Sequence, residues 1–249
     1  MMKKVLFLIP LLFITTSCKK TKISKALDFE LKLDGTYGVS LNASSIEKNI
    51  TIPKKYNDKD VTEISGFRNN DYIETVKFYG NITNIEEGTF TYCQNLRTIT
   101  VEKSNIYSTI NGSLYKNGEL IVYASGNTDS SITIDKNIKS KAFTLAPNLK
   151  KINVKSNKVE NNAFVYLENI EEITISESVT IVSNDFYSGK ELDKLIIKSD
   201  RIANTLEVKN VKNLYVTENT ELSSKTKELY KKVNVEKIDE VVYDVYNLK

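Results

Sequence analysis

The side chains of this 249-residue chain that could do chemistry are few, and histidine is absent from it altogether. Histidine is the commonest general base and a frequent metal ligand, so its absence removes both routes at once. The chain also has no Gly-x-Ser-x-Gly motif, no Walker-type phosphate loop and no dinucleotide-binding glycine pattern. We therefore predict a protein that is not an enzyme and that holds no cofactor.

Pairs of adjacent carboxylates remain as candidates for acid–base chemistry, and two of them lie within the repeats. They are Glu86 with Glu87 and Glu171 with Glu172. Neighbouring residues on turns or strands point in different directions, so we interpret both pairs as solvated coil surface. The acidic segment 57–60 lacks the spacing and the glycine of a calcium loop, so we interpret it as a turn and predict no metal site.

Cys18 is the residue most strongly marked for a covalent modification. It follows a basic start, a short apolar run and small residues, which together are typical of a secretion signal over residues 1–17. A cysteine directly after such a signal indicates a bacterial lipoprotein site, at which the thiol is acylated. An ordinary cleaved signal and a retained anchor helix are the alternatives, although the apolar run is short for a membrane span and Pro10 interrupts it. We predict a secreted protein that lies at the cell surface or on the outer face of a membrane. A lipid on Cys18 would anchor it there, and residues 18–26 would form a polar tether.

Cys93 is the only other cysteine of the chain. If Cys18 carries a lipid, Cys93 has no partner, so no intramolecular disulfide is expected. Cys93 occupies a position of a repeated pattern, described next, at which a small and partly buried residue is needed. We therefore interpret it as an inert core thiol and not as a nucleophile.

Any site in this chain must be positioned by a short unit that recurs along the sequence. Each copy has a phenylalanine, an Ile or Leu six residues later, and an apolar pair three and five residues beyond that. The phenylalanines are Phe67, Phe90, Phe143, Phe164 and Phe186. The apolar pairs are Val76/Phe78, Ile99/Val101, Ile152/Val154, Ile173/Ile175 and Leu195/Ile197.

The alternation within each apolar pair predicts a strand with one buried face. One unit is too short to bury its own apolar residues, whereas stacked copies would share a continuous core. The sequence therefore predicts a mainly β solenoid in which one strand of each coil joins a continuous parallel β ladder. We expect each phenylalanine to insert between its own coil and the neighbouring coils.

The flanking segments predict caps for the two ends of the solenoid. Asp34-Gly35 between two alternating runs indicates a β-hairpin, so residues 27–60 are predicted as the N-terminal cap and entry strand. Residues 61–200 hold the repeats, including one long copy in which Asn117-Gly118 predicts a projecting hairpin. The pattern decays over residues 201–249, where we predict degenerate repeats, a short helix over 223–232 and a small C-terminal cap.

The candidate binding site is the outer face of the predicted ladder. Residues between the buried ones must point outward, and several strands about 4.8 Å apart make a surface large enough for a protein interface. The candidate partner-binding residues are Lys77, Tyr79, Lys151, Asn153, Lys155, Lys194, Ile196, Lys198 and Tyr215. The lysine-rich second half, with Ile196 and Tyr215 exposed, predicts an acidic partner, and the hairpin tip near Asn117 is a second candidate contact. The alternative is that Thr and Lys merely suit exposed sheet positions.

The overall charge gives no reason to expect a nucleic-acid partner. Removing residues 1–17 takes away Lys3 and Lys4 and leaves 33 basic and 32 acidic side chains, a net charge of +1. A chain so close to neutrality has no global field to attract nucleic acid or an anionic membrane. We predict no nucleic-acid binding.

The repeat resembles the BspA-like, or treponemal-type, leucine-rich repeats. The resemblance rests on Ile82/Ile85, Phe90, Cys93 and Leu96/Ile99/Val101 in one copy, and on Ala142-Phe143 and Ala163-Phe164 in others. It extends over residues 36–198 and implies a leucine-rich-repeat solenoid on a cell surface. For function it implies adhesion or binding of an extracellular protein or glycan, of a host or a neighbouring cell. A structural envelope lipoprotein without a specific ligand is the alternative.

Overall fold

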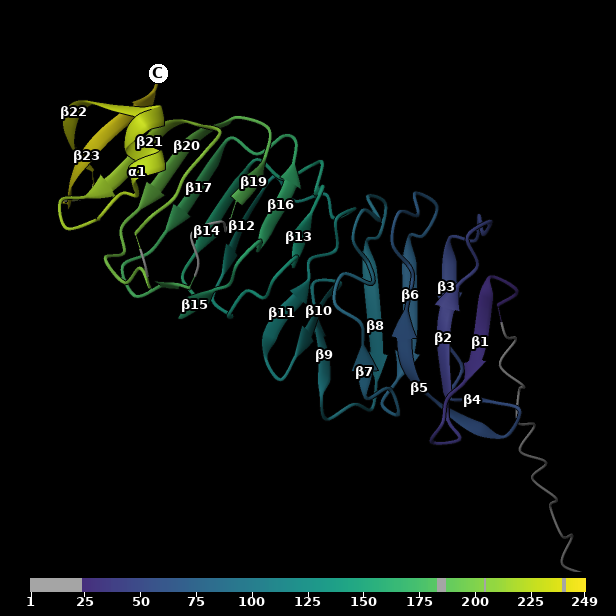
Figure 1. Cartoon of the computed structure of the whole chain (residues 1–249). Helices are drawn as coiled ribbons and strands as arrows, with labels where there is room; N and C mark the ends of the chain where they lie inside the picture. Colours follow the sequence, from purple (N-terminus) through teal and green to yellow (C-terminus); the bar gives the residue numbers. More distant parts are fainter. Residues whose placement is uncertain (1–23, 183–186, 204, 239–240) are drawn as a thin grey trace, which may run out of the picture.

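The computed structural model describes residues 24–182, 187–203, 205–238 and 241–249. The chain winds into an elongated, mainly β solenoid of about eight turns, with the N-terminal half and the C-terminal half end to end (Figure 1). The predicted fold class is therefore confirmed. The predicted signal segment 1–17, Cys18 and Phe186 lie outside the described residues.

Two parallel ladders form the repeated face of the solenoid. The first ladder contains β3 (Asn49–Thr51), β6 (Thr75–Tyr79) and β8 (Thr98–Glu102). The second contains β12 (Ser131–Ile134), β14 (Lys151–Val154), β17 (Glu172–Ile175), β20 (Leu192–Ile197) and β21 (Val211–Thr217). Apolar residues of the repeat pair with each other in register, as Ile152 does with Ile173 and Ile173 with Leu195. This register keeps all inward side chains of a ladder in one core.

One detail of the prediction was wrong, because the parallel ladder is not continuous. β8 ends the first ladder and β12 begins the second, and the long copy of the repeat lies between them. That copy folds into an antiparallel sheet of β9 (Tyr107–Ile110), β10 (Ser113–Lys116) and β11 (Glu119–Val122). The Ile99 N–H donates to the Gly112 carbonyl at 2.8 Å, so the insert occupies the edge of β8 that a further coil would have used. We call the region between β8 and β12 the seam.

The apolar core is divided at the same place. One cluster of buried residues extends from Ala26 to Leu114, and another contains residues between Tyr115 and Tyr230. In the first half the ring centroids of Phe67 and Phe90 are 5.3 Å apart. In the second half Phe143 lies 5.1 Å from Phe164 and 4.7 Å from Tyr123, a residue of the insert. The predicted stacking of the aromatic residues is therefore found within each half and not along the whole solenoid.

Short strands close the other sides of the coils. β13 (Phe143–Thr144), β16 (Phe164–Leu167) and β19 (Tyr187–Gly189) form one parallel set, and β15 (Lys158–Val159) pairs with β18 (Thr180–Ile181). β7 (Asn84–Ile85) pairs with β5 (Lys59–Ser65). Backbone hydrogen bonds therefore join successive coils on more than one side, which keeps each coil in a fixed position for the ladder.

The N-terminal hairpin predicted from Asp34-Gly35 is present. β1 (Leu27–Leu31) and β2 (Tyr37–Leu41) are antiparallel, and β2 continues into the solenoid by pairing in parallel with β5, against which β4 (Lys55–Tyr56) also pairs. Gly35 has a φ of +84°, which glycine adopts without strain. The stacked rings of Phe29 and Tyr56, 3.9 Å apart, help to cover this end of the solenoid.

The C-terminal cap combines a helix with a hairpin. The helix α1 (Ser224–Leu229) begins after Ser223, whose side chain accepts from the Thr226 N–H at 3.2 Å. It is shorter than predicted, because the buried Tyr230 starts β22 (Tyr230–Ile238) and its hydroxyl accepts from the Val211 N–H. β22 pairs with β23 (Val241–Leu248), which is antiparallel to β21. None of the helices in the described part of the chain has the length and apolarity needed to cross a membrane.

Candidate interaction surface

The outward side chains of the second ladder lie in three rows across its strands. Pairing in register aligns Ser131, Lys151, Glu172, Lys194 and Asn213 in the first row. The second row contains Thr133, Asn153, Thr174, Ile196 and Tyr215. Lys155, Ser176 and Lys198 directly follow the ends of β14, β17 and β20, and their backbone N–H groups donate to carbonyls of the preceding strands, which makes the third row. We call these three rows the ladder face.

The structure brings seven of the nine predicted partner-binding residues together on the ladder face. They are Lys151, Asn153, Lys155, Lys194, Ile196, Lys198 and Tyr215. Lys151 and Lys155 are exposed and form no ion pair with any described residue. The Lys194 ammonium lies 4.6 Å from the centroid of the Tyr215 ring, a cation–π contact that fixes both side chains. The face therefore presents positive charge beside an aromatic ring.

The predicted exposure of Ile196 was wrong. This side chain is only 6% exposed although it belongs to an outward row. Thr174 and Tyr215 flank it in register, and the sheet continues beyond Tyr215 to Val245 of the cap hairpin. Because Val245 is also buried, the cap extends apolar packing onto this end of the outer face. Ile196 therefore contributes to packing and offers little surface to a partner.

Lys77 and Tyr79 are not part of the ladder face. Both lie on β6 of the first ladder, on the other side of the seam, so the predicted single surface is divided. Lys77 forms an ion pair with Glu102, and this hydrogen bond raises the pKa of the Lys77 ammonium. The Tyr79 ring has the Lys54 and Lys77 ammonium groups 5.4 and 5.7 Å from its centroid. These contacts occupy the two side chains within their own ladder.

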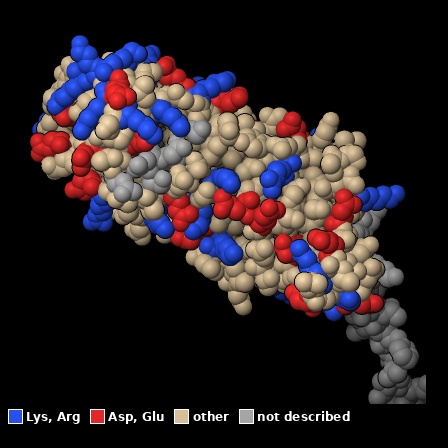
Figure 2. Space-filling view, viewed as in Figure 1, with Lys and Arg blue, Asp and Glu red and all other residues tan. Residues whose placement is uncertain are grey.

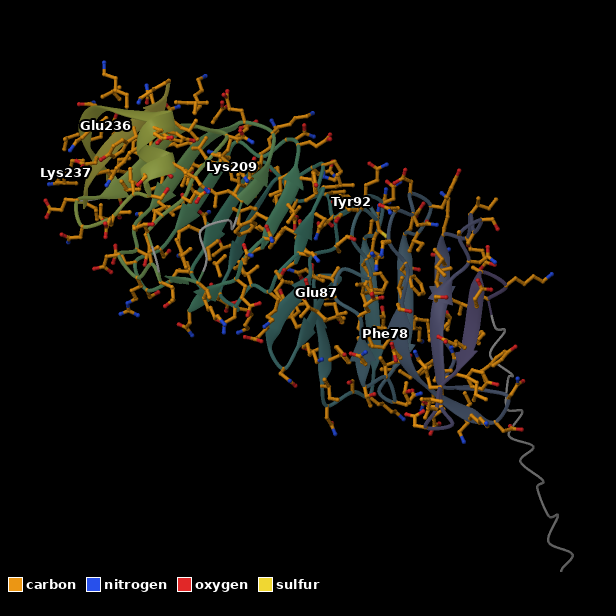
Figure 3. The ribbon with its side chains drawn as sticks, in the orientation of Figure 1. Phe78, Glu87, Tyr92, Lys209, Glu236 and Lys237 are labelled. Atoms are coloured by element: carbon orange, nitrogen blue, oxygen red, sulfur yellow. The ribbon has the colours of Figure 1, made fainter. Side chains whose placement is uncertain are left out.

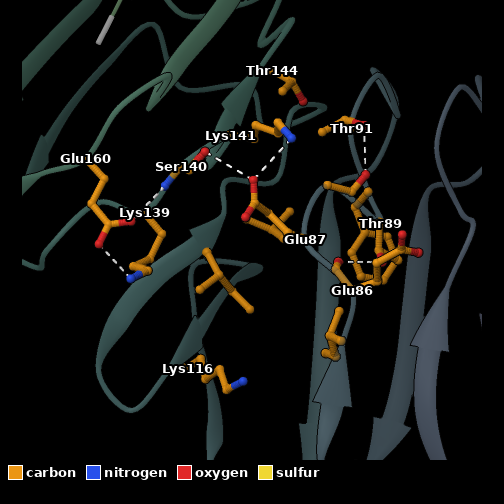
Figure 4. Close-up of a pocket in the computed structure, with 15 residues that line it drawn as sticks. Glu86, Glu87, Thr89, Thr91, Lys116, Lys139, Ser140, Lys141, Thr144 and Glu160 are labelled. Atoms are coloured by element: carbon orange, nitrogen blue, oxygen red, sulfur yellow. Dashed lines mark hydrogen bonds and ion pairs between the residues drawn. The ribbon is translucent and has the colours of Figure 1, made fainter. Parts of the chain in front are cut away.

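A groove at the seam was not predicted from the sequence. Two adjoining hollows of about 220 and 460 Å³ share the residues Glu87, Gly88, Thr91, Lys141 and Thr144. Figure 4 shows the first of them. Glu87 accepts from the Ser140 hydroxyl at 3.2 Å and pairs with Lys141 at 3.1 Å. Tyr92 lines the second hollow together with Glu87, and Figure 3 labels both where the two halves of the solenoid meet. Its ring centroid is 5.3 Å from that of Tyr166. These contacts cross the seam from one half of the solenoid to the other.

Most of the other charges around the groove are paired with one another, whereas the Lys116 ammonium lies 5.8 Å from the centroid of the Tyr107 ring. The Glu160 carboxylate accepts from Lys139 at 2.6 Å and from Lys158 at 3.1 Å. Burial alone would raise the pKa of Glu160, but these two hydrogen bonds, the charge of Lys139 and the Ser140 N–H together lower the pKa below its ordinary value. Because the acids and bases neutralise each other locally, we assign the groove a structural role in holding the two halves together.

The remaining candidates for chemistry have structural surroundings. The Cys93 thiol is buried and donates to the Phe67 carbonyl oxygen at 3.0 Å, and burial raises its pKa to about 11. A thiol of this kind is protonated at neutral pH and is a poor nucleophile.

Among the carboxylate pairs, Glu86 lies 3.4 Å from Arg68 and Glu171 lies 2.8 Å from Lys150. The hydrogen bond from Lys150 lowers the pKa of Glu171, so this acid is ionised at neutral pH. Within the described ranges, no three acidic or cysteine side chains cluster as a metal site would require.

The stacked coils, the parallel ladders and the exposed polar rows define the class of leucine-rich-repeat solenoid proteins. Six copies of the BspA type leucine-rich repeat region match residues 38–135 and 130–241, so the chain belongs to that family. The match extends beyond residue 198, where the resemblance visible in the sequence ended, into the degenerate copies. The curated proteins include no match to this chain.

The chain is similar to solved structures of bacterial leucine-rich-repeat proteins. A leucine-rich repeat protein from Eubacterium ventriosum is similar with a TM-score of 0.52 and 14% identity, over 82% of this chain and 80% of that chain. The leucine-rich repeat protein of T. pallidum gives a TM-score of 0.35 at 11% identity, over 71% and 86%. A leucine rich cell surface protein from Faecalibacterium prausnitzii gives 0.26 at 16%, over 74% and 78%. At 14% identity, the first of these shows that the fold is shared.

Proposed function

We propose that this protein is a cell-surface, lipid-anchored binding protein that attaches to an acidic extracellular protein or glycan through the ladder face. The observation that carries the proposal is the row arrangement, which places Lys151, Lys155 and Lys194 on one continuous sheet surface. Membership of a leucine-rich-repeat family, whose coils present repeated strands as a surface, supports a binding role over catalysis.

The charge pattern supports an acidic partner. Lysines occupy the first and the third row of the ladder face. Glu172 is the one acidic side chain among the residues that define this face. Over the view in Figure 2, by contrast, acidic and basic side chains are mixed, with lysines crowded toward the C-terminal end. A local excess of positive charge attracts an acidic surface and speeds its association, and it does so less at high salt.

Reversing the charge of Lys151, Lys155, Lys194 and Lys198 to glutamate is expected to abolish attachment. Residues 19–249, which contain all of the described structure, would be tested for binding to extracellular matrix proteins and to cells. We expect at least a tenfold loss of affinity, because four repulsive charges replace four attractive ones at one interface. The wild-type affinity should fall as the salt concentration rises.

A matched control reverses four exposed lysines outside the ladder face, Lys55, Lys59, Lys103 and Lys227. This variant has the same net charge as the first, so it should retain binding if the location of the charge matters. Equal binding by both variants and the wild type would remove the ladder face from the function. A deletion strain with a weakened envelope and normal attachment would favour a structural envelope protein.

The lipid anchor is tested by the variant Cys18→Ser. If the Cys18 thiol carries the acyl chain, the variant should lose incorporation of labelled fatty acid and move from the membrane fraction to the soluble one. A single acyl chain gives only marginal membrane binding, so a bacterial lipoprotein modification with more than one chain is expected. Membrane association that survives the substitution would indicate a different anchor or a cleaved signal.

A further inference from the structure

The tip of the N-terminal hairpin exposes two leucine side chains. Leu31, the last residue of β1, is 53% exposed, and Leu33, in the turn that follows, is fully exposed. Figure 1 shows this turn at the lower edge of the N-terminal end of the solenoid, beside β4. Single exposed leucines are common, whereas a patch of several apolar side chains indicates contact with a partner or a membrane. The surroundings of the two leucines therefore decide their role.

Three aromatic rings adjoin the leucines. Phe29 and Tyr56 are stacked, and Tyr37 meets them edge-on with its ring centroid 6.4 and 5.1 Å from theirs. All three rings are half-buried. Leu31 is paired in register with Tyr37, so it extends the aromatic cluster toward the tip. Tyrosine has an apolar ring and a polar hydroxyl, and it is enriched where proteins meet the membrane–water interface. The patch therefore has a composition that suits a lipid surface.

The charged groups next to the leucines are bound within the protein. The Lys32 ammonium lies 3.6 Å from the Glu30 carboxylate and 3.4 Å from that of Glu63. The Asp34 carboxylate accepts from the Thr36 N–H at 2.9 Å and from its hydroxyl at 2.7 Å. Because Lys32 is held by the protein's own carboxylates, attraction of the tip to a membrane would rest on apolar side chains and would depend little on salt.

A lipid on Cys18 would keep this patch within reach of a membrane. The chain advances eight residues from Cys18 to Ala26, and an extended chain spans at most about 3.6 Å per residue, or about 29 Å here. The Ala26 carbonyl accepts from the Asn42 N–H, which fixes the chain where it enters β1. β1 has five residues, about 17 Å at the rise of an antiparallel strand. The tether is therefore long enough for the tip to touch the membrane while the chain enters at the other end of β1.

We propose that the hairpin tip docks on the membrane to which Cys18 is anchored, with the Leu31 and Leu33 side chains inserted among the lipid acyl chains. This inference rests on the lipid anchor of the proposed function and extends it. Two leucines bind a bilayer only weakly from solution, but the anchor makes the contact intramolecular and raises its effective concentration. Docking would fix the orientation of the N-terminal cap relative to the membrane.

A tryptophan reporter tests the docking, because the chain contains no tryptophan. Residues 18–249 with Leu33→Trp would be coupled through the Cys18 thiol to a maleimide lipid in phosphatidylcholine vesicles. The Cys93 thiol is buried and does not compete for the maleimide. We expect blue-shifted emission and quenching by lipids with brominated acyl chains. Ile46→Trp is the matched reporter, since Ile46 is 69% exposed and follows β2 at the opposite end of the hairpin; its emission should remain that of a solvated indole.

A second substitution measures the contribution of Leu31. In the Leu33→Trp protein, Leu31→Asn should lower the ratio of docked to undocked molecules about tenfold, the effect of no longer burying one leucine side chain. Val235→Asn is the control, because Val235 is also 53% exposed but lies in the C-terminal cap. It should leave the quenching unchanged. Raising the salt concentration should likewise leave the quenching unchanged.

The docking and the lipid anchor fail separately in these experiments. The chemical coupling does not depend on acylation in cells, so solvated emission from Leu33→Trp on the vesicles would overturn the docking even if Cys18 incorporates fatty acid. Equal quenching with and without Leu31→Asn would overturn it as well. Quenching of Leu33→Trp on the vesicles together with absent fatty-acid labelling would support the affinity of the tip for lipid and overturn the anchor alone.

Discussion

Replacing Phe164 by alanine is expected to lower the free energy of unfolding of the C-terminal half by about 3–5 kcal/mol, the range for removing a fully buried aromatic ring. Phe164 has no exposed surface, and its ring centroid lies 5.1 Å from that of Phe143. In register it lies between Phe143 and Tyr187 of the neighbouring coils. Deleting the ring therefore leaves a cavity bordered by three successive coils.

The loss of stability caused by Phe164→Ala should be larger in the C-terminal half than in the N-terminal half. In a repeat array, each coil contacts only its neighbours, and here the apolar core is divided between Leu114 and Tyr115. Hydrogen exchange should show faster opening of β14, β16 and β17, with β3 and β6 little changed. The control is Tyr166→Ala, which removes an aromatic ring that is 51% exposed and should cost much less. Equal destabilisation of both halves would show that they unfold as one unit.

Replacing Gly112 by alanine is expected to destabilise the junction of the two halves by about 3 kcal/mol. Gly112 has a φ of +76°, and a Cβ atom there would lie 2.3 Å from the Arg97 carbonyl oxygen. The left-handed backbone costs an L-residue about 1–2 kcal/mol, and overpacking against the main chain adds about 1–3 kcal/mol. The crowded Arg97 carbonyl belongs to the same coil as Ile99, whose N–H donates to the Gly112 carbonyl, so relief of the clash would separate the insert from β8.

Gly118 provides a matched control within the same insert. Its φ is +82°, but a Cβ atom at this position would have no neighbour within 4 Å. Gly118→Ala should therefore show only the backbone cost, about 1–2 kcal/mol. Thermal and denaturant unfolding of the two variants would measure the difference. Equal losses would mean that the close approach of Gly112 to β8 contributes nothing to stability.

The parts of the fold that depend on neighbouring residues were predictable from the sequence. The alternation in Ile152/Val154 or Ile173/Ile175 requires only that one side of a strand be buried, and the structure shows that alternation. Asn117-Gly118 likewise predicts its turn, because both residues adopt positive φ. The same local reasoning assigned Lys151, Lys155 and Lys194 to one outward face. The binding role of that face remains a proposal.

The errors concern contacts between segments that are far apart in the chain. The outward position of Ile196 followed from the alternation, but its burial depends on the cap hairpin, which extends the same sheet. The seam groove joins Glu87 to Ser140 and Lys141, more than fifty residues away, and no spacing in the sequence indicates that pairing.

By itself, the sequence determined the repeating coil, the face on which each strand buries its side chains, and the caps, because period, alternation and turn residues act over a few residues. Only the tertiary structure decided that the ladder divides into two, that the core divides with it, and that a groove opens at the division. The physical reason is that the insert competes for the hydrogen-bonding edge of β8. At that edge the Gly112 backbone lies close to the Arg97 carbonyl and accepts from the Ile99 N–H, contacts that exist only in the assembled coils.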